Sequence, residues 1–373
     1  MDCHHYDAGR CRSCTWLMRP YAEQVAAKQA VVASLLADQS DLVWDEPVTS
    51  AESSFRNKAK MVVGGTTAEP VLGILGPGAS VEDLQDCGIH EPAVRDALPV
   101  IAGFVTRAAL APYDLATRRG ELKYVLVTAS PDGLLMVRFV ARSQEPVTRI
   151  RKHLPWLLER LPSLHVVSVN LQPVHAALIE GPDEIVLTAD AALPMRLDGV
   201  ELLLRPQSFF QTNTAIAAAL YREARRLTAG LHVPEVWDLY CGVGGFALNL
   251  AAPGRSVTGV ETSAEAVASA RTAADRLGVE ALFVAADATD WALGRRDAPD
   301  LVVVNPPRRG IGEELAGWLD GSSTEYVLYS SCNPETLARD LAAMPGFAAV
   351  GARVFDMFPH TDHVEVLMLL RRR

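Results

Sequence analysis

Short apolar runs alternate with longer amphipathic segments through the C-terminal half of the chain. Residues 263–278, for example, place alanine, valine and leucine at helical spacing between two runs of strand-forming residues. Strands that alternate with helices predict an α/β fold with a doubly wound, mostly parallel sheet, because parallel neighbours need a crossover helix. We therefore predict a Rossmann-like domain over residues 201–373. Its expected strands are the segments 235–240, 256–261, 281–287, 301–307, 325–331, 348–358 and 364–370.

The pattern between residues 93 and 200 is more mixed and predicts an α+β region. A pair of strands is expected around the turn Pro131-Asp132-Gly133. The helical segments are 91–110 and 147–161, and the expected strands are 121–130, 134–142, 164–172 and 176–181.

Residues 1–92 contain few long periodic segments, and the stretch 70–88 is rich in turn-forming residues. This region holds four of the six cysteines, namely Cys3, Cys11, Cys14 and Cys87. Spaced cysteines in a chain without a secretory leader indicate metal binding or catalysis more often than disulfides. We predict a small unit held together by a bound ligand. The spacing leaves zinc and an iron–sulfur cluster open, since both use four thiolates.

The charge balance narrows the range of partners. The formal net charge of the 373 residues is -10, whereas general nucleic-acid binders usually have a basic domain. Local basic faces remain compatible with this total. No leader-like or membrane-length apolar run is present, so we expect a cytoplasmic protein without a membrane partner. Basic clusters suited to phosphate contacts are Arg56, Lys58 and Lys60; Arg118, Arg119 and Lys123; Arg149, Arg151 and Lys152; and Arg308 with Arg309.

A glycine-rich turn follows the first expected strand of the C-terminal domain. Gly242, Gly244 and Gly245 permit a tight turn and the close approach of a ligand. Glu261 ends the next strand, about 20 residues later, where a carboxylate can accept ribose hydroxyls. The turn is not Gly-x-Gly-x-x-Gly, which disfavours a pyrophosphate ligand. A ligand with one nucleoside and no phosphate, such as S-adenosylmethionine, fits this pattern.

Asn305 ends the fourth strand and precedes two prolines, at the sheet edge where doubly wound folds bind ligands. Asn/Asp-Pro-Pro loops occur in methyltransferases that act on exocyclic amines, where an aromatic residue normally follows and stacks on the base. Arg308 follows here instead. An amine methyltransferase is therefore an alternative that this loop supports only in part.

Cys332 lies between the end of an expected strand and the start of a helix. Asn333 suits the N-cap of that helix and Pro334 its first turn. The positive end of the helix dipole is expected to lower the pKa of the thiol. A single cysteine is more often a small buried hydrophobe, but this position beside a methyl donor favours an activated nucleophile.

A thiolate and a methyl donor together suit the methylation of a uracil at carbon 5. Addition of the thiolate to carbon 6 makes carbon 5 electron-rich enough to accept a methyl group, and a base must then remove the proton from carbon 5. His360, His363 and Glu365 are candidates for that base. We favour Glu365 because burial in an apolar strand can raise its pKa, although chemistry alone leaves either histidine as a rival.

These motifs resemble the RNA 5-methyluridine methyltransferases, in order along nearly the whole chain. The branch that modifies 23S ribosomal RNA looks most similar, which implies transfer of a methyl group from S-adenosylmethionine to a uracil of 23S ribosomal RNA. A hairpin loop or precursor RNA is the expected substrate, since a base leaves its stack more easily in a loop than in a duplex. The resemblance rests on residues 3–17, 55–63, 120–128, 205–213, 237–248, 302–312, 329–340 and 355–370.

The resemblance also implies roles for individual residues. Cys332 matches the nucleophile and Glu365 the general base. The positions that match contacts to S-adenosylmethionine are Gln211, Tyr240, Glu261 and Asn305. Cys3, Cys11, Cys14 and Cys87 match the ligands of a [4Fe–4S] cluster, which we expect to tie residue 87 to the N-terminus.

The resemblance assigns a function to each predicted range. Residues 1–92 become an iron–sulfur unit, 93–200 an RNA-contacting region and 201–373 the methyltransferase domain. No obligate protein partner is evident from the sequence. An alternative from another class is a non-catalytic iron–sulfur factor that binds RNA or assists ribosome assembly.

Overall fold

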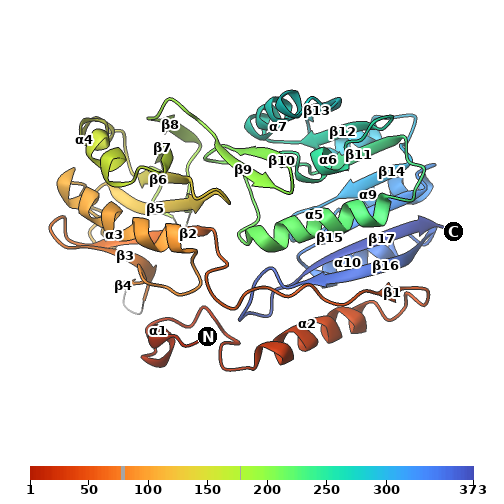
Figure 1. Cartoon of the computed structure of the whole chain (residues 1–373), viewed down its shortest axis with the longest axis horizontal. Coiled ribbons are helices and arrows are strands. Elements are labelled where there is room, and N and C mark those ends of the chain that lie inside the picture. The colour runs from red at the N-terminus through yellow and green to blue at the C-terminus, as the bar shows by residue number, and fades with distance from the viewer. Residues whose placement is uncertain (77–79, 177) are drawn as a thin grey trace. The chain divides into compact units, whose positions relative to one another are not determined.

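The computed structural model describes residues 1–76, 80–176 and 178–373, and the chain folds into two compact units (Figure 1). Neither unit is a continuous piece of sequence, because the chain passes repeatedly from one to the other. The first unit comprises Met1–Cys14, Glu52–Arg196 and Arg205–Gln207, and the second comprises Thr15–Ala51, Leu197–Leu204 and Ser208–Arg373.

The second unit contains an eight-stranded sheet in the order β1-β16-β17-β15-β14-β11-β12-β13. Its strands are parallel except β17, which runs antiparallel to both β15 and β16. The predicted α/β fold with a doubly wound, mostly parallel sheet is therefore confirmed. The strands are β1 (Val43–Trp44), β11 (Glu235–Leu239), β12 (Ser256–Glu261), β13 (Ala281–Ala285), β14 (Leu301–Val304), β15 (Tyr326–Ser331), β16 (Phe347–Phe355) and β17 (Glu365–Arg372).

Polar residues at the strand ends begin several helices of this unit. Asn213, Ser263, Asp287 and Asn333 each accept a hydrogen bond from a backbone N–H in the first turn of the following helix. The central strands β14 and β15 are buried on both faces, as expected where helices cover a parallel sheet. The helices are α2 (Tyr21–Leu35), α5 (Thr214–Thr228), α6 (Gly245–Leu250), α7 (Ala264–Leu277), α8 (Ala288–Leu293), α9 (Gly312–Gly321) and α10 (Pro334–Ala342).

The first unit is built on a seven-stranded sheet in the order β4-β3-β2-β5-β6-β7-β8. Helices α1 (His4–Asp7), α3 (Pro92–Arg107) and α4 (Val147–Arg160) also belong to it, and a ribbon of β9 (Leu193–Leu197) and β10 (Val200–Leu204) follows. Its strands are β2 (Lys58–Gly65), β3 (Pro70–Leu75), β4 (Val81–Asp83), β5 (Leu122–Ala129), β6 (Leu135–Ala141), β7 (Leu164–Leu171) and β8 (Asp183–Val186).

The structure differs from the predicted division at residue 92. Strands β2 to β4 join the sheet of β5 to β8, and Met61 and Leu72 share one apolar core with Phe104 and Phe139. Strands β2 to β4 thus share the apolar core of the residues that follow and do not form a separate unit with the N-terminus. Residues 77–79 of the turn-rich stretch 70–88 lie outside the description. Besides β3, strand β2 pairs with β5, which lies far along the chain, so the local sequence pattern could not reveal this second pairing.

The strand expected over residues 176–181 is wrong for the residues described there, 176 and 178–181. Residue 177 lies outside the description. The last strand of the sheet, β8, instead begins at Asp183 and pairs with β7.

A buried ion pair fixes helix α2 to the C-terminal part of the second unit. The ammonium of Lys28 lies 2.6 Å from Oδ1 of Asp356 and donates to the carbonyl of Phe358 at 2.9 Å. The hydroxyl of Tyr21 donates to the other oxygen of Asp356 at 2.6 Å. Lys28 and Asp356 are both almost fully buried. This network holds the chain just before the segment that leads to Glu365.

Replacing Lys28 with methionine is expected to lower the free energy of unfolding by about 3–5 kcal/mol, because it leaves a buried carboxylate without its cation. Urea unfolding followed by tryptophan fluorescence measures the change. Lys152→Met, at an exposed position of α4, is the matched control and should change stability by less than about 0.5 kcal/mol. A loss below about 1 kcal/mol for Lys28→Met would show that Asp356 does not need this partner.

Candidate active site

Four of the predicted site residues lie at one edge of the sheet of the second unit. Tyr240, Asn305 and Cys332 directly follow β11, β14 and β15, and Glu261 is the last residue of β12. These four strands are parallel neighbours in the order β15-β14-β11-β12, so their carboxyl ends lie side by side. Glu365 begins the antiparallel strand β17 beside β15 and therefore lies at the same edge.

Cys332 and Glu365 are brought together by the pairing of β15 with β17. Ser331 lies opposite Val366 in the register, which places Glu365 across from the position that follows Ser331. Glu365 is 1% exposed, and the hydroxyl of Ser330 donates to its Oε1 at 2.5 Å. Burial raises the pKa of the Glu365 carboxyl to about 7, with the hydrogen bond from Ser330 acting in the opposite direction. A carboxyl with this pKa can accept and release a proton near neutral pH.

The pKa of the Cys332 thiol is raised, so the expectation that the helix end would lower it is wrong. Burial is the largest cause, and the carboxyl of Glu365 adds to it, while the guanidinium of Arg308 acts in the opposite direction. Asn333 does cap α10 as predicted. The sequence showed that cap, but it did not show a buried acid contributed by the neighbouring strand.

The loop after β14 is tied to the segments on both sides of the thiol. The side chain of Asn333 donates to the carbonyl of Arg308 at 3.0 Å. The Arg308 guanidinium also lies 3.2 Å from Nε2 of His363, which is an exposed residue. Arg308 is therefore positioned to stabilise negative charge on Cys332 and to meet an incoming anionic group.

The other candidate base, His360, is held inside the second unit. It is fully buried, its backbone N–H donates to the side chain of Gln24 at 2.9 Å, and its ring lies within hydrogen-bonding distance of the same amide. This engagement indicates a structural role for His360. Of the three candidates, Glu365 is the one that lies across from the thiol.

The glycine-rich turn has the backbone that its sequence predicted. Gly242 and Gly244 adopt positive φ angles of 54° and 86°, and Tyr240 joins them at 70°. A side chain added at Gly242 would meet open space. Glu261 accepts from the backbone N–H of Gly242 at 3.2 Å, and its other oxygen accepts from Ser263. The turn and the carboxylate thus frame a ligand site at the end of β11 and β12.

Asp238 is a polar residue of this site that the sequence analysis missed. It is fully buried in β11, and its Oδ2 accepts from the backbone N–H of Ala247 at 2.8 Å. Its Oδ1 has no hydrogen-bond partner among the described residues, and burial raises the pKa of the carboxyl to about 7. The sequence signal that could have identified Asp238 is an acidic residue inside the apolar strand 235–239.

A cavity of about 560 Å³ opens beside Tyr240 and is also lined by Asp287, Thr289 and Arg309. Gln211 lies in the loop that leads into α5 and is 7% exposed. Helix α5 packs against α6, which follows the glycine turn. The cavity therefore adjoins one of the predicted ligand-binding residues, and Gln211 leads into a helix that packs beside the glycine turn.

The four N-terminal cysteines gather in the first unit, each partly buried. The pKa of Cys14 is raised to about 12, first by burial and then by Cys87, Cys11 and Cys3, so the thiols lie within electrostatic reach of one another. The guanidinium of Arg56 also acts on Cys14. A metal ion or cluster shared by four thiolates would remove their mutual repulsion, so this donor set fits such a group.

Two buried histidines follow cysteines of this set closely in the sequence. His5 lies two positions after Cys3, and His90 lies three positions after Cys87. His5 is 4% exposed and hydrogen-bonds through Nε2 to Asp86 at 2.6 Å. Within the described part of the chain, Nδ1 of His5 and Nδ1 of His90 have no partner. Buried ring nitrogens without a hydrogen-bond partner therefore occur beside two of the four cysteines in the sequence.

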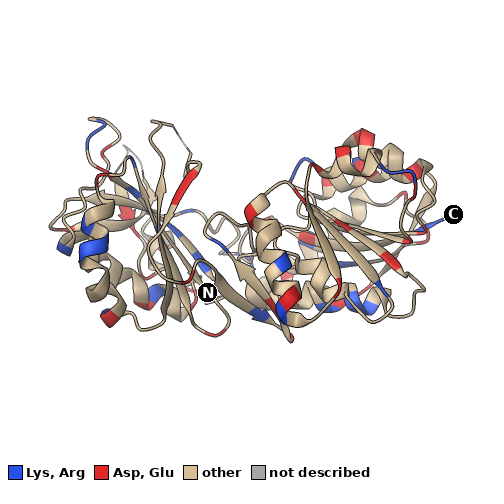
Figure 2. Ribbon diagram, turned by 90° about the horizontal axis from the view of Figure 1, so that it is seen from above, with Lys and Arg blue, Asp and Glu red and all other residues tan. Residues whose placement is uncertain are grey.

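The basic residues are spread over both units, where they alternate with acidic ones (Figure 2). Burial alternates along residues 56–60, where Asn57 and Ala59 are buried, Arg56 and Lys58 are partly exposed and Lys60 is exposed. The cluster of Arg118, Arg119 and Lys123 is only partly available, because the Lys123 ammonium is buried against Gln172 and the carbonyl of Val174.

Among the residues described, no helix is both long enough and apolar enough to cross a lipid bilayer.

Comparison with known proteins identifies close relatives along the whole chain. The sequence is 49% identical over 372 residues to the 23S rRNA (uracil(747)-C(5))-methyltransferase of Escherichia coli K12, covering 99% of both chains. It is 48% identical over 374 residues to the protein of the same description from Citrobacter koseri, covering all of both chains. The family model described as tRNA (Uracil-5-)-methyltransferase matches residues 293–373, and a general methyltransferase-domain model matches residues 236–307.

Among solved structures, the chain is similar to the Pyrococcus abyssi tRNA (uracil-54, C5)-methyltransferase crystallised with S-adenosyl-L-homocysteine. The TM-score is 0.80 with 24% sequence identity, and the match covers 96% of this chain and 84% of the other. This likeness shows that the two proteins share a fold.

Proposed function

Since the chain belongs to the family of RNA uracil-C5 methyltransferases, we propose that it methylates carbon 5 of the uracil at position 747 of 23S ribosomal RNA, the target named for its relatives. It is an S-adenosylmethionine-dependent enzyme. The observation that carries the proposal is the meeting of a thiol and a buried carboxyl, Cys332 and Glu365, at the ligand edge of the sheet.

Cys332 acts as the nucleophile of the reaction. Its thiolate forms a C–S bond to carbon 6 of the uracil, and the electrons of the 5,6 double bond move toward the carbonyl at carbon 4. Bound S-adenosylmethionine supplies an electrophilic methyl group to carbon 5. The Arg308 guanidinium acts on Cys332 to lower the thiol pKa and so favours the thiolate that attacks.

Glu365 acts as the general base that ends the reaction. Its carboxylate removes the proton from carbon 5, the 5,6 double bond re-forms, and the C–S bond to Cys332 breaks. A pKa of about 7 leaves a large fraction of the carboxyl ionised at neutral pH, so it can take this proton. The hydroxyl of Ser330 holds the carboxyl in place opposite the thiol.

The residues that hold S-adenosylmethionine surround the glycine turn. Glu261 can accept a ribose hydroxyl at Oε2, which takes one protein hydrogen bond, whereas Oε1 already accepts from Thr262 and Ser263. Tyr240 forms an aromatic wall, Asn305 a polar contact near the reacting carbon, and Gln211 a further contact to the cofactor. The unpartnered oxygen of Asp238 supports a cationic or N–H donor at this place.

Cys3, Cys11, Cys14 and Cys87 hold a [4Fe–4S] cluster in this proposal. Their grouping in one unit, with only one Cys-x-x-Cys pair, supports a cluster over a zinc site, which more often has two such pairs. The cluster would tie α1 to the segment around Cys87 and so close the N-terminal edge of the first unit.

Anaerobically purified protein is expected to be brown and to contain about four iron atoms per chain. Cys87→Ser should lose most of the iron and the broad visible absorbance, since one of four ligands is gone. Cys241→Ser is the matched control, because that thiol is buried in the other unit. Iron analysis and absorption spectra measure both variants, and a colourless protein with one zinc per chain would overturn the cluster.

The proposed activity is tested by mapping methylated uridines. The purified protein, methyl-labelled S-adenosylmethionine and unmodified 23S ribosomal RNA should give 5-methyluridine at a single site, position 747 in the numbering of the relatives. Label on an exocyclic amine would favour the amine methyltransferase, and RNA that binds but stays unlabelled would favour a non-catalytic factor. RNA containing 5-fluorouridine should form a stable covalent adduct, because fluorine at carbon 5 cannot leave as a proton.

A further inference from the structure

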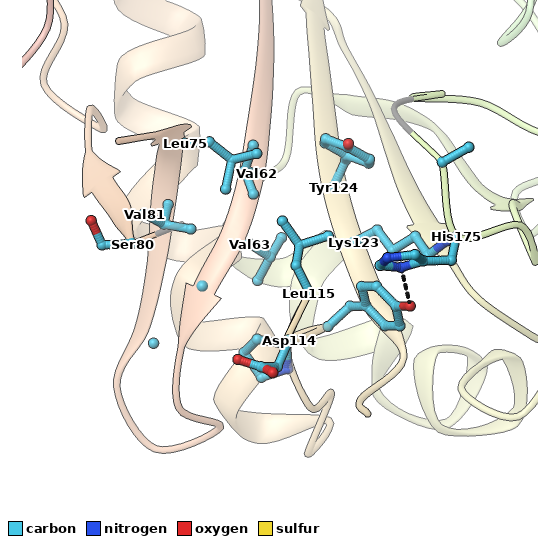
Figure 3. A pocket seen from close by; sticks show the side chains of 15 residues that line it. Val62, Val63, Leu75, Ser80, Val81, Asp114, Leu115, Lys123, Tyr124 and His175 are labelled. Atoms are coloured by element: carbon cyan, nitrogen blue, oxygen red, sulfur yellow. Dashed lines mark hydrogen bonds between the residues drawn. The ribbon is translucent and has the colours of Figure 1, made fainter. Parts of the chain in front are cut away.

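A cavity of about 410 Å³ opens on the first unit, among β2, β3, β5 and the loop before β5 (Figure 3). This volume falls in the range of roughly 300–1,000 Å³ typical of small-ligand sites. Val62 and Tyr124 lie directly opposite each other in the β2–β5 register, so their side chains share one face of the sheet. Leu75, Val81 and Leu115 complete an apolar lining around the aromatic ring of Tyr124.

One wall of this cavity is held in a fixed arrangement. The hydroxyl of Tyr113 lies 3.0 Å from Nδ1 of His175 (Figure 3). The ammonium of Lys123 lies 4.8 Å from the centre of the Tyr113 ring and donates to the carbonyl of Val174 at 2.8 Å. Lys123 is 7% exposed, so it acts as an internal support that holds the Tyr113 ring and the backbone just before His175 at the cavity.

Asp114 lines the cavity, and the turn that begins with it continues to two arginines. Oδ1 of Asp114 accepts from the backbone N–H and the hydroxyl of Thr117, each at 2.6 Å, and its backbone N–H donates to the carbonyl of Arg119. This turn places Arg118 and Arg119 close to Asp114 in the chain path. Both arginines are exposed, and no ion pair is formed by either one within the described part of the protein.

We propose that this cavity binds one unpaired base of the RNA substrate, a second base in addition to the target uracil; this inference rests on the proposed function. The base stacks on Tyr124 among apolar side chains, as bases stack on aromatic residues in single-strand binders. Asp114 and His175 offer a hydrogen-bond acceptor and a ring nitrogen to its edge. The free guanidinium groups of Arg118 and Arg119 meet the flanking phosphates. The cavity thereby helps to select the RNA loop.

The first test measures binding of a fluorescently labelled hairpin of 23S ribosomal RNA by anisotropy. Tyr124→Ala is expected to weaken binding about 5- to 150-fold, the loss that corresponds to one base–aromatic stack. Tyr124→Phe keeps the ring and should stay within about twofold of the unchanged protein. Leu115→Trp fills the mouth from a 40% exposed position and should weaken binding like Tyr124→Ala, while Leu158→Trp, on the surface of α4, should not.

The second test identifies the base with abasic nucleotides placed one at a time through the hairpin loop. One position other than the target uracil should weaken binding to the unchanged protein as much as Tyr124→Ala does. At that position the losses of binding free energy from the abasic change and from Tyr124→Ala should not add, because each change removes the same contact. Additive losses at every loop position, or equal binding by Tyr124→Ala and unchanged protein, would overturn the inference.

Methylation of the same hairpin separates this inference from the proposed function. Suppose that the unchanged protein methylates the target uracil and that Tyr124→Ala binds the RNA as tightly as the unchanged protein does. This result would contradict the second-base site and leave the proposed function standing. If the unchanged protein failed to methylate any RNA, the proposed function would be contradicted. Tyr124→Ala should raise the KM for RNA with little change in kcat, and tight binding of a free nucleotide without any effect on RNA affinity would point to a small-molecule site instead.

Discussion

Methylation of the target uracil is expected to fall by a factor on the order of 10⁴ or more when Cys332 is replaced with alanine, because the variant cannot add to carbon 6 and carbon 5 stays unreactive. Methyl transfer from labelled S-adenosylmethionine to the RNA hairpin measures this loss. The covalent adduct with 5-fluorouridine RNA should also disappear. Binding of S-adenosylmethionine should persist, since the thiol follows β15 and the glycine turn follows β11, two strands away in the sheet.

The matched control removes the other thiol of the second unit. Cys241→Ala should still form the 5-fluorouridine adduct, because Cys241 is buried and its thiol pKa is raised far above the ordinary value by burial. A Cys332→Ala protein that methylates at the normal rate would show that the reaction proceeds without a covalent adduct. Methylation of an exocyclic amine by that variant would then become the better explanation.

Replacing Glu365 with glutamine is expected to trap the enzyme on its RNA. The thiolate still adds and the methyl group still transfers, but the amide cannot accept the proton from carbon 5, so the C–S bond does not break. Denaturing electrophoresis should show a covalent complex carrying one labelled methyl group per protein. Multiple-turnover methylation should fall by about 10²- to 10⁴-fold, the usual contribution of a general base.

The pH dependence of product release gives a second test of the role of Glu365. The pKa of the Glu365 carboxyl is raised to about 7, so the base is ionised above that pH and protonated below it. Release of product should therefore slow as the pH falls through about 7, and adduct should accumulate in the unchanged protein.

Two variants show whether trapping of the covalent adduct is caused by the loss of Glu365. Glu335→Gln changes an exposed acid in the first turn of α10 and should turn over normally. His363→Ala should also release product. If His363→Ala trapped the adduct and Glu365→Gln did not, the histidine would be the base.

Local sequence patterns predicted the sheet of the second unit from β11 onward, but they did not predict that α2 and β1 belong to this unit. Its strands are apolar runs that end in Tyr240, Asn305 and Cys332, and parallel strands bring such ends to one edge whatever the details of packing. The position of Glu365 could be predicted because β17 begins immediately after a polar segment. The effect of a residue at one strand end on the pKa of a residue at another strand end could not be predicted in the same way. The raised pKa of Cys332 depends on burial and on Glu365, which comes from a different strand.

The first unit was predicted less well for the same reason. The stretch before Cys87 has few periodic residues, but β4 pairs with β3 and β3 pairs with β2, whose other partner β5 comes after an intervening helix. Lys123 shows how far the role of a single side chain can be predicted from the sequence. A lysine in a basic cluster is typical of a phosphate contact, yet its ammonium is buried against a carbonyl and an amide brought in from residues 172–174.

The pairing of Lys28 with Asp356 has a consequence for how the protein is made. The two residues are 328 positions apart, and a ribosome adds about 5–20 residues per second. Helix α2 therefore emerges on the order of 15–65 s before the partner of its lysine has been synthesised. During that interval Val25 and Val32, buried in the finished protein, have no surface to cover them. Helix α2 is thus made early but is locked in place only when the C-terminal part of the chain has been synthesised.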